Sequence, residues 1–395
     1  MSSLKSFKLS QLAEILGAEV EGDPNKEIFG IGTLINSTDQ DISFIARESY
    51  VSQLSTTKAG AVICDSNISK IYEGNKLICQ DPYLLYAKCT KLFKEKPLKE
   101  TGISKLASIE DSASVSEHAS ISNFVTISDD VVIADDVLIM PGVFIGKGCS
   151  VGKGTILYSN VSIYDSVEVG NDCIVHAGAV IGSDGLGFAK ENNEWVKVEH
   201  LGKVMIGDNV EIGSNTTIDR GSVGNTVIEN NVKIDNQVHI AHNVYVGSGT
   251  AIAGNSAIAG STKVGKNCTL AGCTAIVDNV EITDEVHITA MSLITKSINA
   301  GSEEEIINKC IDSRNTSSIM IIIYGRNAND RSPYVKQEQL VKMGFNKVYV
   351  YPGGMFEWLL LQDIYGSDVF PTTIPERDLL KYKPKQALYS NLIEY

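Results

Sequence analysis

The sequence predicts a mainly β protein, a left-handed parallel β-helix of hexapeptide repeats with a small α/β unit on either side. Two observations predict it. An aliphatic residue returns at every sixth position through most of the middle of the chain, and the flanking segments instead alternate helix-like and strand-like patterns. With 395 residues, the chain is long enough for several domains, each with its own core.

The six-residue period runs from 109 to 181, resumes from 206 to 218, and continues from 228 to 294. It matches neither the 3.6-residue period of a helix nor the alternation of a strand, and it is typical of a β-solenoid whose flat faces are one hexapeptide wide. Three hexapeptides form one coil. The aliphatic residue then points to the axis, and glycine, asparagine, aspartate and serine occupy the corners.

The two interruptions, 182–205 and 219–227, do not fit the repeat and are expected to leave the prism as loops. Solenoids tolerate such loops without any function. Loops on a rigid scaffold are also where binding and catalytic sites are commonly built.

The flanking patterns divide the chain into three expected domains: an N-terminal α/β domain at 1–100, the β-helix at 101–298, and a C-terminal α/β unit at 299–395. In the first, LSQLAEILG and YLLYAKCTKLFKE read as helices, and AEVEG, IFGIGTL, DISFIA and AGAVIC read as strands. In the last, IMIIIYG and KVYVYPGG read as strands, with VKQEQLVKMGF as a helix between them.

The composition excludes some classes of function. A formal net charge of -14 argues against a broad surface for nucleic acid. The eight cysteines contain no C-x-x-C pair, the first residues contain no apolar signal run, and no apolar stretch is long enough to span a bilayer. We therefore expect a reduced, cytoplasmic protein with at most peripheral membrane contact.

Three segments carry a family resemblance: NVKIDNQVHIAHNVYVG at 231–247, TTIDRG at 216–221, and GSDGLGFA at 182–189. Together they closely resemble the UDP-3-O-acylglucosamine N-acyltransferases of lipid A biosynthesis, and the resemblance extends over about residues 7–296. It implies a homotrimer with active sites between neighbouring prisms. It also implies transfer of a 3-hydroxyacyl chain from acyl carrier protein to the 2-amino group of UDP-3-O-acylglucosamine, without a metal or an organic cofactor.

The resemblance places the general base at His242, in the IAHN motif. An amine that attacks a thioester must lose a proton, and an imidazole can accept it near neutral pH. Without the motif, a lone corner histidine would be read as a solvated turn residue. Asn243, His239 and Asn279 are expected to line the substrate groove, and Asn279 stands where the relatives usually have a second histidine.

The segment DISFIARESYVSQLSTTKAGAVIC resembles the family's uridine-binding segment. Phe44 and Tyr50 match the aromatic pair that holds uracil, and Arg47 stands where the family often has asparagine. At the other end of the resemblance, Leu293, Thr295 and Lys296 correspond to the region that accommodates the acyl chain and meets the carrier protein. Leu293 and Thr295 replace methionines that are frequent in relatives.

Beyond the repeat, YGRNANDRSPYVKQEQLVKMGFNKVYVYPGGMFEWL resembles the second half of a rhodanese domain. Gly325 occupies the position of the catalytic cysteine that precedes Arg331, and without a thiolate no sulfur transfer is expected. We expect an inactive C-terminal unit.

Two alternatives to the leading function stay open at this point. One keeps the fold and the base but uses coenzyme A or acyl carrier protein to acylate a different UDP-amino sugar. The other is a catalytically retired trimeric scaffold, suggested by Asn279 and by the C-terminal unit.

Overall fold

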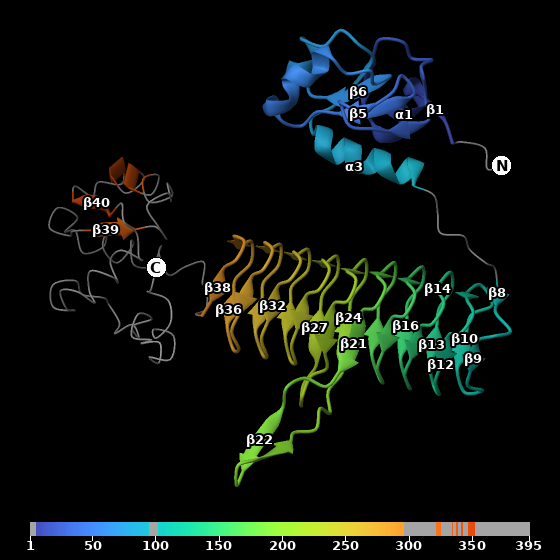
Figure 1. The fold of residues 1–395 in the computed structure, drawn as a ribbon, viewed down its shortest axis with the longest axis vertical. Helices are drawn as coiled ribbons and strands as arrows, with labels where there is room; N and C mark the ends of the chain where they lie inside the picture. Colours follow the sequence, from blue (N-terminus) through green and yellow to red (C-terminus); the bar gives the residue numbers. More distant parts are fainter. Residues whose placement is uncertain are drawn as a thin grey trace, which may run out of the picture. The chain divides into compact units, whose positions relative to one another are not determined.

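The computed structural model describes residues 5–94, 102–295, 321–324 and 347–351, with a few positions between the last two segments. The chain divides into two compact units, 1–100 and 101–395 (Figure 1).

The N-terminal unit contains a five-stranded sheet and four helical segments. Its sheet has the order β2 (Glu19–Glu21), β7 (Lys76–Ile78), β6 (Ala61–Cys64), β5 (Asp41–Phe44), β4 (Gly30–Ile31). The pair β1 (Phe7–Lys8) and β3 (Glu27–Ile28) is separate and antiparallel. The helical segments are α1 (Leu9–Leu16), the 3₁₀ helix η1 (Glu48–Ser55), α2 (Ser66–Ser69) and α3 (Pro82–Phe93).

Local sequence explains the two longer α-helices. Leu9, Leu12 and Leu16 of α1 are buried at helical spacing, and the helix ends at Gly17 in the left-handed conformation that glycine adopts without strain. Helix α3 begins after Asp81, whose carboxylate accepts a hydrogen bond from the Leu84 amide at 3.0 Å. The predicted helices and the strands at β2, β5 and β6 are confirmed. The strand predicted at IFGIGTL is instead divided between β3 and β4, which belong to different sheets. Strand β7 was not predicted.

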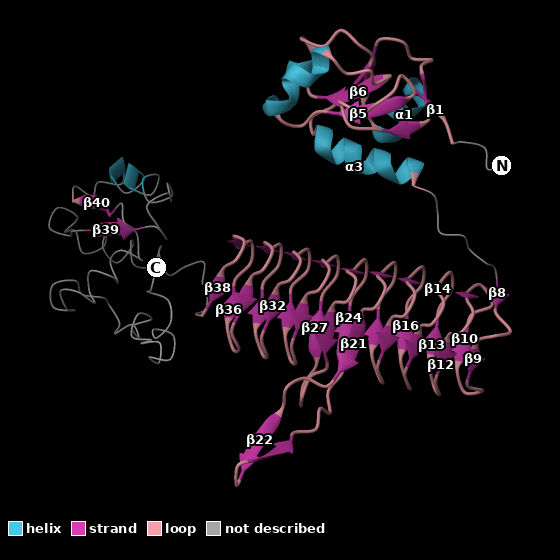
Figure 2. Cartoon of the chain, viewed as in Figure 1, coloured by secondary structure: helices cyan, strands magenta, loops and turns pink. Residues whose placement is uncertain are grey.

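The second unit is a parallel β-solenoid with three flat sheets (Figure 2). The first face contains β10 (Ser114–Val115), β13 (Val132–Ile133), β16 (Ser150–Val151), β19 (Glu168–Val169), β24 (Val204–Ile206), β27 (Thr226–Ile228), β30 (Tyr245–Val246), β33 (Lys263–Val264) and β36 (Glu281–Ile282).

The second face contains β8 (Gly102–Ile103), β11 (Ser120–Ile121), β14 (Leu138–Ile139), β17 (Ile156–Leu157), β20 (Ile174–Val175), β25 (Glu211–Ile212), β28 (Lys233–Ile234), β31 (Ala251–Ile252), β34 (Thr269–Leu270) and β37 (His287–Ile288). The third face contains β9 (Ser108–Ile109), β12 (Thr126–Ile127), β15 (Phe144–Ile145), β18 (Ser162–Ile163), β21 (Val180–Ser183), β26 (Thr217–Asp219), β29 (His239–Ile240), β32 (Ala257–Ile258), β35 (Ala275–Ile276) and β38 (Leu293–Ile294).

The register explains the six-residue period. Each strand pairs in parallel with the strand one coil later, as Ile240 pairs with Ile258. The aliphatic residues of successive coils therefore stack along the axis, and Ile240 and Ile258 are both fully buried. Burying one such side chain stabilises the fold by about 1.5–3 kcal/mol, so one core runs the length of the prism. The predicted β-helix is confirmed.

The corners have a conformation that recurs with the same period. One residue in most corners from Phe124 onward takes a positive φ, for example Asn231 at 59°, Asn243 at 61° and Asn255 at 58°. Asparagine and glycine tolerate this left-handed region best. Phe124 and Met291 also adopt it, so the packing of the coils imposes this conformation even on large side chains.

The first interruption is not a plain loop. Within it, β22 (Phe188–Glu191) and β23 (Glu194–Lys197) form an antiparallel hairpin that projects from the solenoid (Figures 1 and 2). Asn192 and Asn193 at its tip both have positive φ, which suits a tight two-residue hairpin turn. The composition of this segment concealed its strands, since most of their side chains are exposed.

Beyond the solenoid, β39 (Ile321–Tyr324) and β40 (Val348–Tyr351) pair in parallel. The described positions between them, at 334, 337–338 and 341–342, are helical. This strand, helix and strand order agrees with the predicted one. The boundary expected at 298/299 stays a prediction.

Candidate active site

His242 lies in the corner between β29 and β30. Its Nδ1 is 3.1 Å from the side-chain oxygen of Asn243, and that oxygen also accepts hydrogen bonds from the amide and the hydroxyl of Ser222 at 2.9 and 2.8 Å. Because an amide oxygen only accepts, Nδ1 of His242 carries the proton. The other ring nitrogen, Nε2, is then a bare acceptor, as a general base requires.

Two glycines leave room for the His242 ring. A Cβ atom at Gly260, one coil further on, would lie 2.7 Å from both Cε1 and Nε2 of His242. A Cβ atom at Gly185 would lie 2.9 Å from Oδ2 of Asp219 and 3.3 Å from Cδ2 of His242. The ring is therefore packed closely between the next coil and the 182–205 interruption.

Asp219, at the end of β26, is only 5% exposed. One oxygen is 3.2 Å from the Ser183 hydroxyl and the other is 3.7 Å from Nε2 of His239, which is half exposed. Burial raises the pKa of Asp219, and the nearby histidines, His239 first, together with the Ser183 hydrogen bond act in the opposite direction. His239 also shares a 2.8 Å hydrogen bond with the hydroxyl of Thr217, which fixes its ring.

Two residues of this cluster, Asp219 and His200, were not among the site residues predicted from the sequence. His200 lies in the 182–205 interruption, is 6% exposed, and places its ring 5.6 Å from that of His242 at an angle of 75°. No motif pointed to it. The available signals were its place near the end of the interruption and the GSDGLGFA segment before the hairpin. Gly187 of that segment leaves room for the His200 ring, since a Cβ atom there would lie 2.7 Å from Cε1 of His200.

The two interruptions are bonded to each other beside His242. The amide of Leu201 donates to the carbonyl of Ser222 at 2.7 Å, and the amide of Gly202 donates to the carbonyl of Gly221 at 2.9 Å. The Arg220 side chain donates to the Gly202 carbonyl at 2.7 Å. The breaks in the repeat therefore form one fixed wall around the base.

The structure separates Asn279, the third predicted groove residue, from this cluster. Asn279 occupies the same corner as Asn243 two coils later, about 10 Å away at the usual strand spacing, and donates to the Asp278 carboxylate at 2.9 Å.

On the third face the outward positions after His239 are Ala257, Ala275 and Leu293. This column forms a strip with short side chains that leads from the histidine cluster to Leu293, about 14 Å away at the same spacing. Leu293 is 66% exposed and Thr295 is also exposed. Lys296 lies outside the described residues.

The N-terminal unit has its own pocket, of about 790 Å³, lined by Phe44, Arg47, Tyr50 and six neighbours from the loops before and after β5 and from η1. The predicted trio is thus brought together. The pocket also contains Tyr83 from α3, which the sequence did not indicate. One face of Phe44 is covered by Tyr86, with ring centroids 3.9 Å apart, while Tyr50 is 46% exposed.

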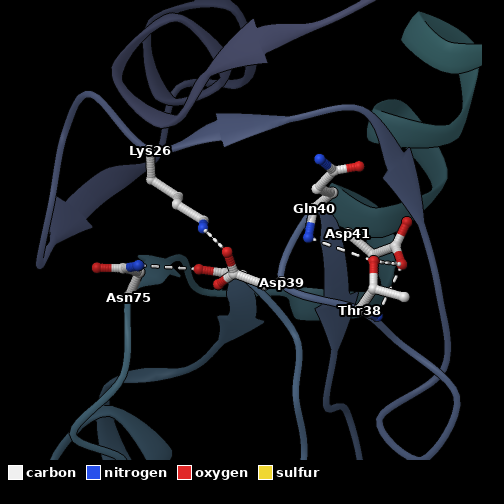
Figure 3. Close-up of polar contacts among 7 residues, drawn as sticks. Lys26, Thr38, Asp39, Gln40, Asp41 and Asn75 are labelled. Atoms are coloured by element: carbon white, nitrogen blue, oxygen red, sulfur yellow. Dashed lines mark hydrogen bonds and ion pairs between the residues drawn. The ribbon is translucent and has the colours of Figure 1, made fainter.

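Hydrogen bonds fix the loop that leads into this pocket (Figure 3). The amide and the hydroxyl of Thr38 donate to Asp41 at 2.8 and 2.7 Å, and Lys26 forms an ion pair with Asp39 at 2.5 Å. Strand β5, which carries Phe44, begins at Asp41. The pocket wall is therefore held before any ligand binds.

No group of three or more histidine, cysteine, aspartate or glutamate side chains in the described segments has an arrangement that could hold a metal ion. Within the same segments, no helix is long and apolar enough to cross a membrane.

Three family models match the chain. The model of UDP-3-O-(3-hydroxymyristoyl) glucosamine N-acyltransferase matches residues 25–92, and that of the bacterial transferase hexapeptide matches 148–183 and 225–260. The rhodanese-like domain matches 276–361, so this match begins within the last coils of the solenoid.

Individual relatives match over longer stretches. A UDP-3-O-acylglucosamine N-acyltransferase of Hahella chejuensis is 43% identical over 293 residues, which are 74% of this chain and 84% of that protein. Its counterpart in Pseudoalteromonas translucida is 58% identical over 228 residues, 58% of this chain and 67% of that protein. Among solved structures, an Arabidopsis UDP-N-acetylglucosamine acyltransferase aligns with a TM-score of 0.46 and 22% identity, covering 50% of this chain and 68% of that one.

Proposed function

We propose that this chain, which belongs to the UDP-3-O-acylglucosamine N-acyltransferase family, transfers a 3-hydroxyacyl group from a thioester to the 2-amino group of UDP-3-O-acylglucosamine. The observation that carries the proposal is the state of His242. Asn243 fixes its Nδ1–H, which leaves Nε2 bare within a packed cluster of polar side chains.

In the proposed reaction, Nε2 of His242 accepts a proton from the amine as the nitrogen attacks the thioester carbonyl. The new amide bond forms as the carbon–sulfur bond breaks, and the proton passes to the departing thiolate. His242 is therefore regenerated. No metal or organic cofactor takes part.

Asp219 is assigned a supporting role. Its buried carboxylate would act as the counter-ion when His242 becomes an imidazolium. The electrostatic interaction between Asp219 and His242 supports this assignment. His239 holds the other side of Asp219. The cluster keeps all of these contacts, which argues against a retired scaffold.

The pocket of the N-terminal unit is assigned to the uracil of the UDP-sugar. Tyr50 offers an open ring face for stacking, Phe44 presents a face that Tyr86 supports from behind, and Arg47 adds a hydrogen-bond donor. Because guanidinium cannot accept a hydrogen bond, Arg47 would contact an oxygen of the base or of the phosphates.

The acyl chain is assigned to the strip along the third face, over Ala257 and Ala275 toward Leu293. We propose acyl carrier protein as the donor, with Lys296 as a basic contact for it. A homotrimer in the cytoplasm completes the proposal. These assignments follow the family resemblance. The short side chains of the strip also support placing the acyl chain there.

The C-terminal unit, proposed to span 299–395, is assigned no sulfur-transfer activity because Gly325 stands where the nucleophilic cysteine would be. The full chain should release no thiocyanate from thiosulfate and cyanide. Turnover in that assay would contradict the assignment.

The acceptor experiment tests the proposed reaction. The full chain is incubated with 3-hydroxyacyl carrier protein and UDP-3-O-acylglucosamine, and products are identified by mass spectrometry. The same sugar with its amine already acetylated is the matched control. We expect one added acyl group on the free amine and none on the control. No product with the free amine would overturn the proposal.

The departures at Asn279, Leu293 and Thr295 favour one alternative, a shorter acyl group from coenzyme A on another UDP-amino sugar. Equal amounts of carrier-bound and coenzyme A-bound acyl groups of several lengths would compete in one reaction. Preferred use of the carrier-bound group supports the proposal, and preferred use of coenzyme A supports the alternative.

A further inference from the structure

His200 has an unusual hydrogen-bonding state. Its Nδ1 lies 3.1 Å from the carbonyl oxygen of Val198, which can only accept, so Nδ1 carries the proton and Nε2 is bare. That Nε2 is buried and has no hydrogen-bond partner within the described part of the chain. Buried acceptors are nearly always paired, and an unpaired one calls for an explanation at a functional site.

The position of His200 is fixed by its surroundings. Val198, its hydrogen-bond acceptor, is itself tied by its amide to the carbonyl of Gly187 at 2.8 Å, and Gly187 leaves the space that the His200 ring occupies. The next residue, Leu201, is bonded to the second interruption through Ser222. The ring cannot move away from His242 without breaking these contacts.

The ring beside His200, that of His242, changes charge during the proposed reaction. His242 is neutral before the amine attacks and cationic while it holds the proton. The two rings are 5.6 Å apart and nearly perpendicular. Because Nε2 of His200 is buried, its lone pair attracts a nearby cation more strongly than it would in bulk solvent.

Other charged groups also surround the pair. They are Asp219 on β26, His239 on β29, Arg220 beside the second interruption and, within the first, the Asp184–Lys197 ion pair at 2.5 Å. All of them stay in place when only His200 is changed. A substitution that keeps a ring but removes the nitrogen therefore isolates the contribution of Nε2.

We propose that His200 is a positioning residue of the acyl-transfer site, whose bare Nε2 stabilises the protonated form of His242. The inference rests on the proposed function and deepens it, because the cation it stabilises exists while the amine proton is in transit. Replacing His200 should make His242 a weaker base. It should not change how the UDP-sugar binds.

The test is the pH titration of the His242 ring, followed by NMR in the full-length chain. The His242 signal is assigned from its loss in His242→Ala. In His200→Phe, the midpoint of the titration should fall by about half a pH unit, equivalent to roughly a threefold weaker affinity for the proton. The acid limb of kcat/KM against pH should move in the same direction, kcat should fall about threefold, and KM for the UDP-sugar should stay unchanged.

The matched control is Trp195→Ala, which removes an exposed aromatic ring from the hairpin of the same interruption and should leave both measurements at wild-type values. If His200→Phe does not fold, His200→Leu removes the same nitrogen with a smaller side chain. An unchanged titration of His242 in a folded variant would overturn the inference. The titration needs no turnover, so an inactive wild-type chain would refute the proposed function and leave this test intact.

Discussion

The Gly260→Ala substitution adds a single methyl group against the His242 ring. The new Cβ would lie 2.7 Å from Cε1 and Nε2 and 3.2 Å from Nδ1 of His242, whereas ordinary van der Waals contacts of a Cβ atom lie at 3.4–4 Å. The ring must therefore shift by roughly 0.7 Å at its Nε2 edge. The φ of Gly260 is outside the left-handed region, so alanine causes no backbone strain there.

A misplacement of about 1 Å in a catalytic group can lower the rate about 100-fold, so we expect kcat to fall roughly 10- to 100-fold. KM for the UDP-sugar and the circular dichroism spectrum should stay unchanged. Gly272→Ala is the matched control, because its nearest neighbour would be the Gly254 carbonyl at 3.4 Å. Wild-type kcat in a folded Gly260→Ala variant would refute the assignment of His242 in its present geometry.

Three further predictions concern the cluster, the pocket and the core. Burial raises the pKa of Asp219, so its ionised form is disfavoured in the folded chain, and its contribution to stability falls as pH rises from the ordinary aspartate value through the raised pKa. The melting temperature of Asp219→Asn should therefore exceed that of wild type, by a margin that grows with pH, while its kcat falls. A melting temperature below that of wild type at pH 8 would contradict this. Tyr50→Ala should raise KM for the UDP-sugar by about 5- to 150-fold at constant kcat, since stacking on a base contributes about 1–3 kcal/mol, and Ile15→Ala on α1 should leave KM unchanged. Ile240→Ala should lower the free energy of unfolding in urea by about 2–5 kcal/mol, because the side chain is fully buried; a loss near zero would mean that the coil collapses around it.

The solenoid was predictable from the sequence because its rule is local. Each coil repeats the same geometry, so the buried position recurs every six residues and Ile240 and Ile258 can be assigned to the core without any three-dimensional information. The flanking helices α1 and α3 followed from a different local pattern, apolar residues at helical spacing.

The site was only partly predictable. His242 and Asn243 were indicated by their motif, and Phe44, Arg47 and Tyr50 by their segment. The contact of His200 with His242 depends on how an interruption folds back on the prism, which no period encodes. Tyr83 reaches the pocket from a helix far along the chain, through tertiary packing alone.

The most direct test of the central assignment compares wild type with His242→Ala in the formation of N-acylated product from carrier-bound 3-hydroxyacyl and UDP-3-O-acylglucosamine. His242 lies on the rim of the core rather than inside it, so the variant should fold and give the wild-type circular dichroism spectrum. The account predicts a loss of about 10²- to 10⁴-fold in kcat, the usual contribution of a general base. A folded His242→Ala variant that forms product at the wild-type rate would contradict it.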